Sequence, residues 1–312
     1  MSENLITQDQ LFRICKKHGL PWHEPEELLR TGIVNHAIAI GDVVIRIPCD
    51  PEWAQEDTRT EAVAVPAALK AGIRTPEAVL FDFDLDIVPT IFSVYRRVAG
   101  RPWMQLFDDP AVTEATGHFI GRSLRQLHDS VVEAPDPNGW LDDHGMPTTE
   151  RFIQESLQNG TLEPETAAWL LAWHETLMAQ TGQVLEQKVF CHGDLHECNV
   201  LVEPGQAPWI IDWGDAGWAD PSVDFGNMHP GTWVATFAGY GEVEDPAALR
   251  AASTVSALER CVGRLASGVR SPSIGNALVT KLVRLLRFFQ HAPPEWAHCA
   301  PPAGIGFKLA GG

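Results

Sequence analysis

The stretch of sequence that decides the fold is residues 191–202, which read CHGDLHECNVLV, followed by residues 210–213, which read IIDW. Apolar runs on both sides of the turn PGQAP at 204–208 predict two short antiparallel strands, 199–203 and 209–212. A turn centred between residues 205 and 206 sets Asn199 opposite Asp212 across this hairpin. An amide oxygen and a carboxylate side by side suit Mg²⁺, which leaves coordination positions for phosphate oxygens.

Asp194 lies five residues before Asn199, within reach of whatever such a metal would hold. The transition state of phosphoryl transfer is loose, so a protein must mainly place an acceptor hydroxyl in line and neutralise phosphate charge. One carboxylate beside two residues that bind a metal ion meets this requirement. The spacing of Asp194, Asn199 and Asp212 therefore favours transfer of a phosphoryl group to a hydroxyl.

The first third of the chain predicts a small antiparallel α+β unit. Thr7 is a plausible cap for its first helix, and Gly41-Asp42 predicts a tight turn between its first two strands. Pro66, inside its second helix, predicts a kink or a late start. The expected helices are 6–17 and 56–71, and the expected strands of a sheet of about five are 32–40, 43–48, 78–82 and 90–98.

After Ala99-Gly100 the pattern becomes mainly helical. Apolar residues recur at helical spacing over several long segments, interrupted by the hairpin described above. The expected helices are 111–130, 149–158, 164–181, 246–267 and 276–290.

The motifs resemble those of the aminoglycoside phosphotransferase family and, to some extent, the macrolide phosphotransferases, which share the protein-kinase fold. The matching residues are His192-Gly193-Asp194-Leu195-His196 with Asn199, then Ile211-Asp212-Trp213, then residues 220–225, DPSVDF. The resemblance implies a two-lobed α+β fold with a small antiparallel-sheet N-terminal lobe and a mainly helical C-terminal lobe. We assign residues 1–98 to a nucleotide-binding lobe and 99–312 to a catalytic and substrate-binding lobe.

The resemblance also implies a role for each residue of the motif. Asp194 orients the acceptor hydroxyl and takes its proton, and His196 approaches the γ-phosphate. Asn199 and Asp212 hold Mg²⁺. Asp224 supports the catalytic loop through hydrogen bonds to its backbone.

In the first lobe, Arg46 occupies the place of the phosphate-binding lysine of many kinases, and Glu61 is the candidate for its helix partner. Arginine keeps the charge but presents a planar fork. The competing interpretation is that Arg46 and Glu61 are ordinary surface residues on a strand and a helix. Adenine is expected against the backbone of the strand-to-linker passage 93–100, so ATP and GTP both fit. The remaining predicted nucleotide contacts are Asn35, Tyr95, Arg97 and Val98.

The formal net charge of −18 argues against nucleic acid and anionic membranes as partners. Residues 99–245 carry 5 basic and 24 acidic side chains, whereas residues 246–312 carry 8 and 2. A cationic acceptor would be drawn to the acidic middle of the chain, although a solvated acidic surface explains the charge equally well. No signal-peptide core, long apolar run or paired cysteine framework is present in the sequence, so we expect a soluble cytoplasmic protein.

Three other classes of protein compete with a small-molecule phosphotransferase. Only eight residues separate Asp212 from Pro221, too few for the long activation segment with which a protein kinase docks peptides. A nucleotide-binding pseudokinase is expected to lack one of the three motif residues, and all are present. A zinc module would use four soft ligands from one tight loop, which rarely closes a tetrahedron. Those ligands are Cys191, His192, His196 and Cys198; we expect His192 instead to bond backbone carbonyls inside the loop.

The acceptor is expected to be a small hydroxylated molecule. Asp215, Trp218 and Trp233 are candidates to contact it, against the competing interpretations of loop solvation for Asp215 and core packing for the tryptophans. Asp220 is either a helix cap or a site residue. The expected acceptor is an antibiotic, an aminoglycoside before a macrolide, whose phosphorylation would confer resistance. Kinases of amino alcohols or sugars carry the same motifs and are the alternative.

Overall fold

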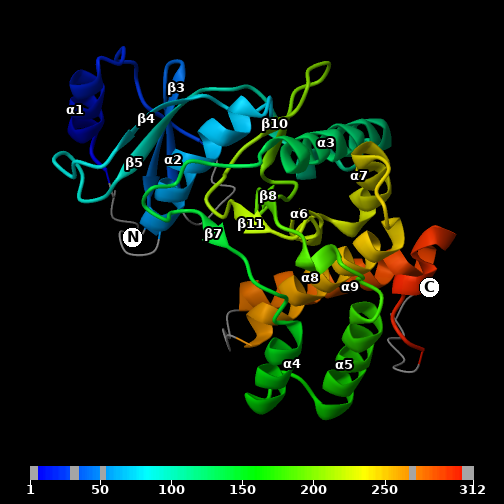
Figure 1. Cartoon of the computed structure of the whole chain (residues 1–312). Helices are drawn as coiled ribbons and strands as arrows, with labels where there is room; N and C mark the ends of the chain where they lie inside the picture. The colour runs from blue at the N-terminus through cyan, green and yellow to red at the C-terminus, as the bar shows by residue number, and fades with distance from the viewer. Residues whose placement is uncertain (1–5, 29–34, 50–53, 267–271, 304–312) are drawn as a thin grey trace.

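The computed structural model describes residues 6–28, 35–49, 54–266 and 272–303. An antiparallel sheet with two helices occupies the N-terminal end of the molecule, and a larger, mainly helical part follows it (Figure 1). The two-lobed α+β arrangement predicted from the sequence is therefore confirmed. The division of the chain at residue 98 stays a prediction.

The N-terminal lobe is built on one antiparallel sheet with the strand order β1-β2-β3-β5-β4. The turn predicted at Gly41-Asp42 joins β2 to β3, with Gly41 at φ +61°. The predicted strand 32–40 begins at Asn35 in the structure, and residues 32–34 lie outside the described part. The elements are α1 (Gln8–His18), β1 (Glu26–Glu27), β2 (Asn35–Ile40), β3 (Val43–Pro48), α2 (Ala54–Lys70), β4 (Ala78–Asp82) and β5 (Phe92–Arg96).

Local chemistry sets the start of α1, and packing overrides it in α2. Thr7 forms a capping box with Gln10, in which each side chain accepts a hydrogen bond from the other residue's backbone N–H. Helix α2 is continuous through Pro66, so the predicted late start is wrong. Pro66 is exposed, whereas Ala64 and Val65 beside it are buried. Burial of the neighbouring residues offsets the lost backbone hydrogen bond.

Helix α2 also connects the two lobes. Its buried residues Ala64 and Val65 belong to the same apolar core as Ile210 and Trp213 of the larger lobe. The other face of the sheet packs against α1 in a smaller, separate core. Because side chains alternate along a strand, Arg46 of β3 points away from that smaller core and toward α2.

The C-terminal lobe combines seven helices of the described chain with six short strands. Helix α7 was not predicted, because it is short and has no charged residue to mark its ends. It packs on α3 at a close approach, where a Cβ on Gly121 would lie 2.0 Å from the carbonyl oxygen of Thr236. Among the described residues, no helix is both long and apolar enough to span a bilayer. The helices are α3 (Pro110–Ser130), α4 (Thr149–Gln158), α5 (Pro164–Met178), α6 (Val223–Gly226), α7 (Trp233–Tyr240), α8 (Pro246–Ala266) and α9 (Pro272–His291), and the strands are β6 (Arg101–Pro102), β7 (Asp142–Asp143), β8 (Val189–Cys191), β9 (Val200–Val202), β10 (Trp209–Ile210) and β11 (Gly217–Ala219).

The predicted hairpin is present, but its register differs by one residue. Strand β10 pairs with β9 so that Ile210 lies opposite Val200, and the backbone N–H of Ile211 donates to Asn199 at 2.9 Å. Asn199 is thus opposite Ile211 rather than Asp212. The turn lies at 203–206, where Pro204 precedes Gly205 at φ +80° and the Gln206 N–H donates to Glu203 at 3.0 Å, and one further residue between this turn and β10 sets Ile211 opposite Asn199. This is the type II arrangement of Pro and Gly, one residue earlier than predicted.

Candidate active site

A buried carboxylate forms hydrogen bonds to the backbone of the loop between β8 and β9. Asp224, from α6, accepts hydrogen bonds from the backbone N–H groups of His192 at 3.0 Å and Gly193 at 2.9 Å. Gly193 has φ +84°, and a Cβ there would lie 1.8 Å from the carbonyl oxygen of Asp215. The loop therefore requires glycine at this position. The contact predicted for Asp224 is present.

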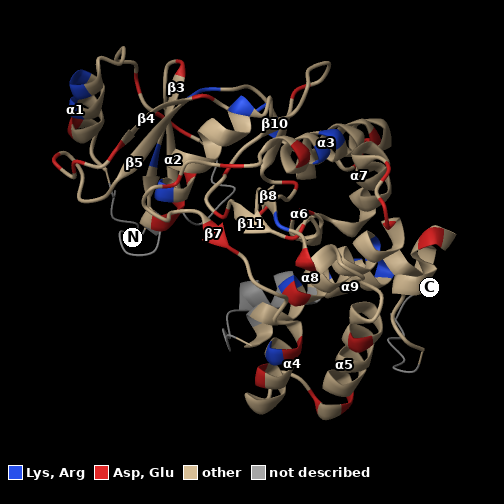
Figure 2. Ribbon diagram, viewed as in Figure 1, with Lys and Arg blue, Asp and Glu red and all other residues tan. Residues whose placement is uncertain are grey.

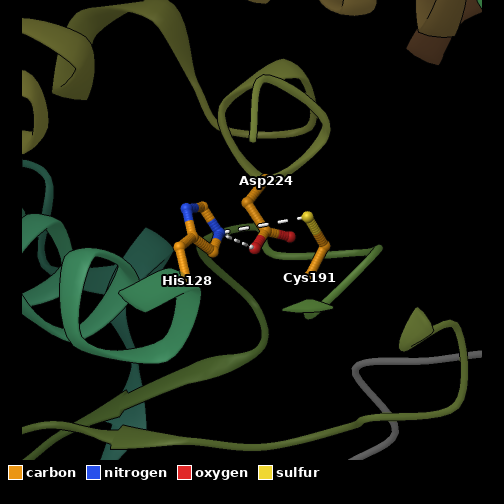
Figure 3. Close-up of side chains that lie close together, drawn as sticks. All are labelled: His128, Cys191 and Asp224. Carbon is orange, nitrogen blue, oxygen red and sulfur yellow. Dashed lines mark hydrogen bonds and ion pairs between the residues drawn. The ribbon is translucent and has the colours of Figure 1, made fainter. Parts of the chain in front are cut away.

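Asp224 has a further partner, His128 of α3, which sequence reasoning missed. Figure 3 shows the imidazole of His128 directed at the carboxylate, with Nε2 at 3.0 Å, and Cys191 beside them. The other ring nitrogen of His128 lies 2.9 Å from the Tyr240 hydroxyl. Burial would raise the pKa of Asp224, but the hydrogen bond with His128 and the backbone N–H groups hold that pKa below its usual range. The carboxylate is thus ionised at neutral pH.

The four soft side chains considered for zinc do not come together. Cys191 is buried and donates to the Asp220 carbonyl oxygen at 3.4 Å. His192 contacts the Ile211 carbonyl oxygen at 3.0 Å and packs on Trp213, so its carbonyl partner lies in the hairpin rather than in the loop. His196 faces Asp194, and the Cys198 thiol contacts the sulfur of Met104 at 3.8 Å. These four side chains therefore form no common ligand cluster; the potential ligands near Cys191 are His128 and Asp224 instead.

Asp194 lies in the loop with both carboxylate oxygens engaged. Asn227, which follows α6, donates to Oδ1 at 2.7 Å, and His196 Nε2 lies 3.4 Å from Oδ2. The Cys198 backbone N–H donates to His196 Nδ1 at 3.1 Å, so the ring proton resides on Nε2, facing Asp194. Although burial opposes the charged form, the hydrogen bond from His196 and nearby positive charge keep the pKa of Asp194 below its usual range. Asn227 had no signal in the sequence beyond its place three residues after Asp224.

Asn199 comes just before β9 and Asp212 lies two residues after β10, and the two are not directly opposite each other in the hairpin. The Asn199 side-chain amide donates to the Asp194 carbonyl oxygen at 3.0 Å, which leaves its own oxygen as a ligand atom. Asp212 has φ +70°, unusual for a residue other than glycine, and lies beyond the end of β10. Strand alternation therefore does not set the direction of its side chain.

Arg46 connects the two lobes by ion pairs. Its two terminal nitrogens contact Glu61 of α2 and Asp212, respectively. The Tyr95 hydroxyl donates to the other oxygen of Glu61 at 2.7 Å, so the side chain of Tyr95 supports this pair. Arg46 is partly buried and Glu61 is buried, and the two are paired, so they are not ordinary surface residues of a strand and a helix.

A third carboxylate near Arg46, Asp57, was not predicted from the sequence. It lies one helical turn before Glu61, and its Cβ is 2.6 Å from the position that a Cβ on Gly214 would take. Burial, followed by the negative charges of Asp215 and Asp212, raises the pKa of Asp57 to about 7. Carboxylates therefore outnumber the guanidinium here, and the imbalance fits a site that takes a cation.

Of the predicted nucleotide contacts, only some lie near one another in the structure. Asn35 begins β2, and its buried side-chain oxygen has no hydrogen-bond partner among the residues that the structure describes. Arg97 forms an ion pair with Glu26 of β1 at 2.8 Å, and its backbone N–H donates to Asp42 at 2.8 Å. Arg97 and Val98 line a cavity of about 460 Å³ near the β9–β10 turn.

A second cavity, of about 410 Å³, opens beside Asp194; we call it the acceptor pocket. Loss of hydration and the charge of Asp194 raise the pKa of Asp215 in its wall. Both residues of β7 are aspartates, and this strand stands out in red beside β11 in Figure 2. The charged residues of the pocket wall are of both signs: Asp194, Asp215, Asp220, Glu259, Arg260 and Lys281.

The two predicted tryptophans do not line this pocket. Trp233 is fully buried, donates to the Phe225 carbonyl oxygen at 3.0 Å and stacks on Trp296, so it is a core residue. Trp218 is half-buried in β11 and packs edge-on against Phe190. Asp220 is buried and accepts a hydrogen bond from the Ser222 backbone at 2.9 Å, the geometry of a turn cap.

The sheet lobe, the helical lobe and the loop between them define the fold class of the kinases. An aminoglycoside 2'-phosphotransferase-IIIa mutant in complex with GDP superposes with a TM-score of 0.68 at 18% identity, over 89% of this chain and 95% of that one. A choline/ethanolamine kinase family protein from Mesorhizobium loti gives 0.63 at 19% identity, over 93% and 97%. A macrolide 2'-phosphotransferase from Brachybacterium faecium gives 0.61 at 18% identity, over 88% and 98%.

The model of the phosphotransferase enzyme family (APH) matches residues 34–261, and the chain belongs to this family. No curated protein sequence matches the chain. The resemblance that the motifs predicted, the kinase-like fold and the assignment as a small-molecule phosphotransferase are thus confirmed.

Proposed function

We propose that the protein transfers the terminal phosphoryl group of ATP, or of GTP, to a hydroxyl of a small molecule in the acceptor pocket. The observation that carries this proposal is the pairing of Asn199 with Asp194 and of Arg46 with Asp212, residues that come from three segments of the chain. Asn199 contacts the backbone of Asp194 at 3.0 Å, and Arg46 of the other lobe is paired with Asp212. Phosphoryl transfer requires positioning and charge neutralisation, and this set supplies both.

Asp194 takes the proton of the hydroxyl group that receives the phosphoryl group. Its carboxylate lies in the wall of the acceptor pocket, is ionised at neutral pH and is held by Asn227 at 2.7 Å. A fixed carboxylate can orient a hydroxyl for in-line attack and take its proton as the new bond to phosphorus forms. His196 Nε2 lies 3.4 Å from the same carboxylate, which supports a role for His196 in contacting the phosphoryl group.

Asn199 and Asp212 are the residues that would hold Mg²⁺. Their donor set, one amide oxygen and one carboxylate, suits this ion, and the excess of carboxylates around Arg46 fits a cation. The bound ion would neutralise charge on the phosphates. Arg46 presents a fork of N–H groups for a phosphate oxygen, and the backbone near Tyr95, Arg97 and Val98 is the proposed contact for the base.

For the acceptor we propose an antibiotic, with an aminoglycoside before a macrolide, and resistance by inactivation as the biological outcome. Four carboxylates in or beside the acceptor pocket support a ligand with ammonium groups. Arg260 and Lys281 in the same wall favour the alternative, a smaller amino alcohol or sugar that needs less negative charge around it.

The acceptor is tested by ADP release from MgATP with a panel of hydroxyl compounds. The panel contains kanamycin, streptomycin, spectinomycin, a macrolide, choline, ethanolamine and simple sugars. Turnover with the antibiotics alone supports the resistance function, and turnover with choline, ethanolamine or a sugar supports the metabolic alternative. Nucleotide binding without release of ADP in any assay would instead indicate a pseudokinase.

The proton acceptor is tested by Asp194→Asn. We expect kcat to fall by about 10³-fold, because the amide cannot take a proton, while binding of MgATP is retained. Asp108→Asn, at an exposed position outside the pocket, is the matched control and should leave kcat unchanged. Turnover of Asp194→Asn close to that of the unmodified protein would refute the assigned role.

A further inference from the structure

Arg260 reaches the catalytic loop from the acceptor side of the site. It lies on α8, is partly buried, and lines the acceptor pocket. Its Nη2 donates to the carbonyl oxygen of Gly193 at 2.8 Å, across 67 residues of sequence. A guanidinium hydrogen bond at this distance is of the stronger, charge-assisted kind.

The carbonyl that Arg260 holds belongs to the peptide that carries Asp194. The N–H of Gly193 is held by Asp224 at 2.9 Å, and its carbonyl oxygen also lies 3.4 Å from the Asn227 amide. With φ +84° and no side chain, Gly193 has little intrinsic preference for this conformation, so neighbouring groups must maintain it. The orientation of the Asp194 carboxylate depends on that peptide.

Charge adds to this geometry. The guanidinium of Arg260 stands close enough to Asp194 and Asp215 to interact with both carboxylates. It is thus a positive charge beside the proposed proton acceptor, supplied by an element that also forms the wall against which the acceptor would lie. None of the motifs at 191–225 contains it, and it was not singled out in the sequence.

We propose that Arg260 is a positioning residue for phosphoryl transfer: it fixes the Gly193–Asp194 peptide from the acceptor side and so sets the direction of the Asp194 carboxylate. This inference rests on the proposed function. It predicts that loss of Arg260 lowers kcat while the nucleotide site, formed around Arg46, is unaffected.

The test compares Arg260→Met, Arg260→Lys and Arg260→Ala in the full-length chain, assayed by ADP release from MgATP with the best acceptor of the panel above. We expect kcat to fall by about 10–100-fold in Arg260→Met, with KM for ATP changed by less than about threefold. Arg260→Lys should retain part of the activity, because it keeps the charge but not the fork. Arg287→Met, at an exposed position on α9, is the matched control and should behave as the unmodified protein.

Chemical rescue separates positioning from a merely structural role. Added methylguanidinium should restore kcat of Arg260→Ala by about tenfold or more, since it can refill the space and rebuild the bond to Gly193. It should not restore Asp194→Asn.

A kcat within about twofold of the unmodified protein in Arg260→Met, or an Arg260→Ala enzyme that methylguanidinium does not restore, would overturn the role of Arg260 alone. Absence of phosphoryl transfer by the unmodified protein to every acceptor would overturn the proposed function together with it.

Discussion

Arg46 holds two carboxylates on opposite ends of its guanidinium, and the two belong to different parts of the chain. Glu61 is on α2 and is almost fully buried, whereas Asp212 follows the β9–β10 hairpin and is about one-third exposed. A buried charge is tolerated only while it is paired. The contact between the N-terminal lobe and the C-terminal lobe at this point therefore depends on a single side chain, which is also the proposed phosphate contact.

The substitution Arg46→Met should lower the free energy of unfolding by about 3 kcal/mol, because Glu61 would keep a buried charge without its partner. Urea unfolding followed by circular dichroism measures the change. The double substitution Arg46→Met with Glu61→Gln removes the stranded charge and should recover part of the loss. Equal stability of Arg46→Met and the unmodified protein would contradict the pairing.

Gly193 provides a second prediction at this scale. Gly193→Ala should lower kcat by about 100-fold, because its Cβ would displace the Asp215 backbone and move Asp194. Gly139→Ala is the matched control: Gly139 also has positive φ, +65°, but a Cβ there meets nothing within 4 Å. It should cost only about 1 kcal/mol of stability and leave kcat unchanged. Equal loss of activity in the two variants would show that backbone strain, rather than contact with Asp215, is the cause.

Among the elements, those with strong local signals were predicted and those made by tertiary contact were not. The Thr7 cap of α1 and the Gly41 turn depend on neighbouring residues, and both were found where expected. Helix α7 and strand β11 exist because they pack against α3 and pair with β8, which no local pattern reports. The hairpin was predicted in kind but not in register, because one further residue lies between the turn at Pro204-Gly205 and β10.

The residues of the site also divide into those that the sequence predicted and those that only tertiary contacts reveal. Asp194, Asn199 and Asp212 are close in sequence on or beside one hairpin, so the sequence pointed to all three, although Asn199 lies opposite Ile211 rather than Asp212. His128 and Arg260 reach the catalytic loop from helices 63 or more residues away along the chain. Only the folded core determines which of many histidines and arginines arrives there.

Helix α2 yields a prediction at the scale of the element. Pro66 is exposed within the continuous helix, where it removes one backbone hydrogen bond. Pro66→Ala should therefore raise the free energy of unfolding by about 1–2 kcal/mol, after allowance for the greater freedom of the unfolded chain. Lys70→Ala, exposed in the same helix, is the control and should change it by less than about 0.5 kcal/mol. Denaturant unfolding that shows Pro66→Ala to be less stable would contradict this account.

The change in the free energy of unfolding of the whole molecule at low pH should depend on Asp224. A carboxyl group whose pKa is lower in the folded than in the unfolded state stabilises the fold fully above its unfolded pKa, near 4. That contribution is lost as the pH falls through the folded pKa. Asp224→Asn should therefore be less stable than the unmodified protein at pH 7 by about 1–3 kcal/mol, and the difference should shrink below about pH 4. Unfolding curves at several pH values measure it, and a difference that does not change with pH would exclude Asp224 as the source.

The attachment of α2 to the larger lobe limits how the sheet of the N-terminal lobe can move relative to that lobe. Besides their shared core, hydrogen bonds join Thr60 to Trp140, Gln126 to Ala71 and Ile210 to Arg74. Helix α2 and the chain just after it are thus fastened to the C-terminal lobe at three places. A nucleotide would enter through a hinge motion of the β-strands over a stationary helix, so that amide hydrogen exchange slows on ATP binding in β2 and β3 more than in α2.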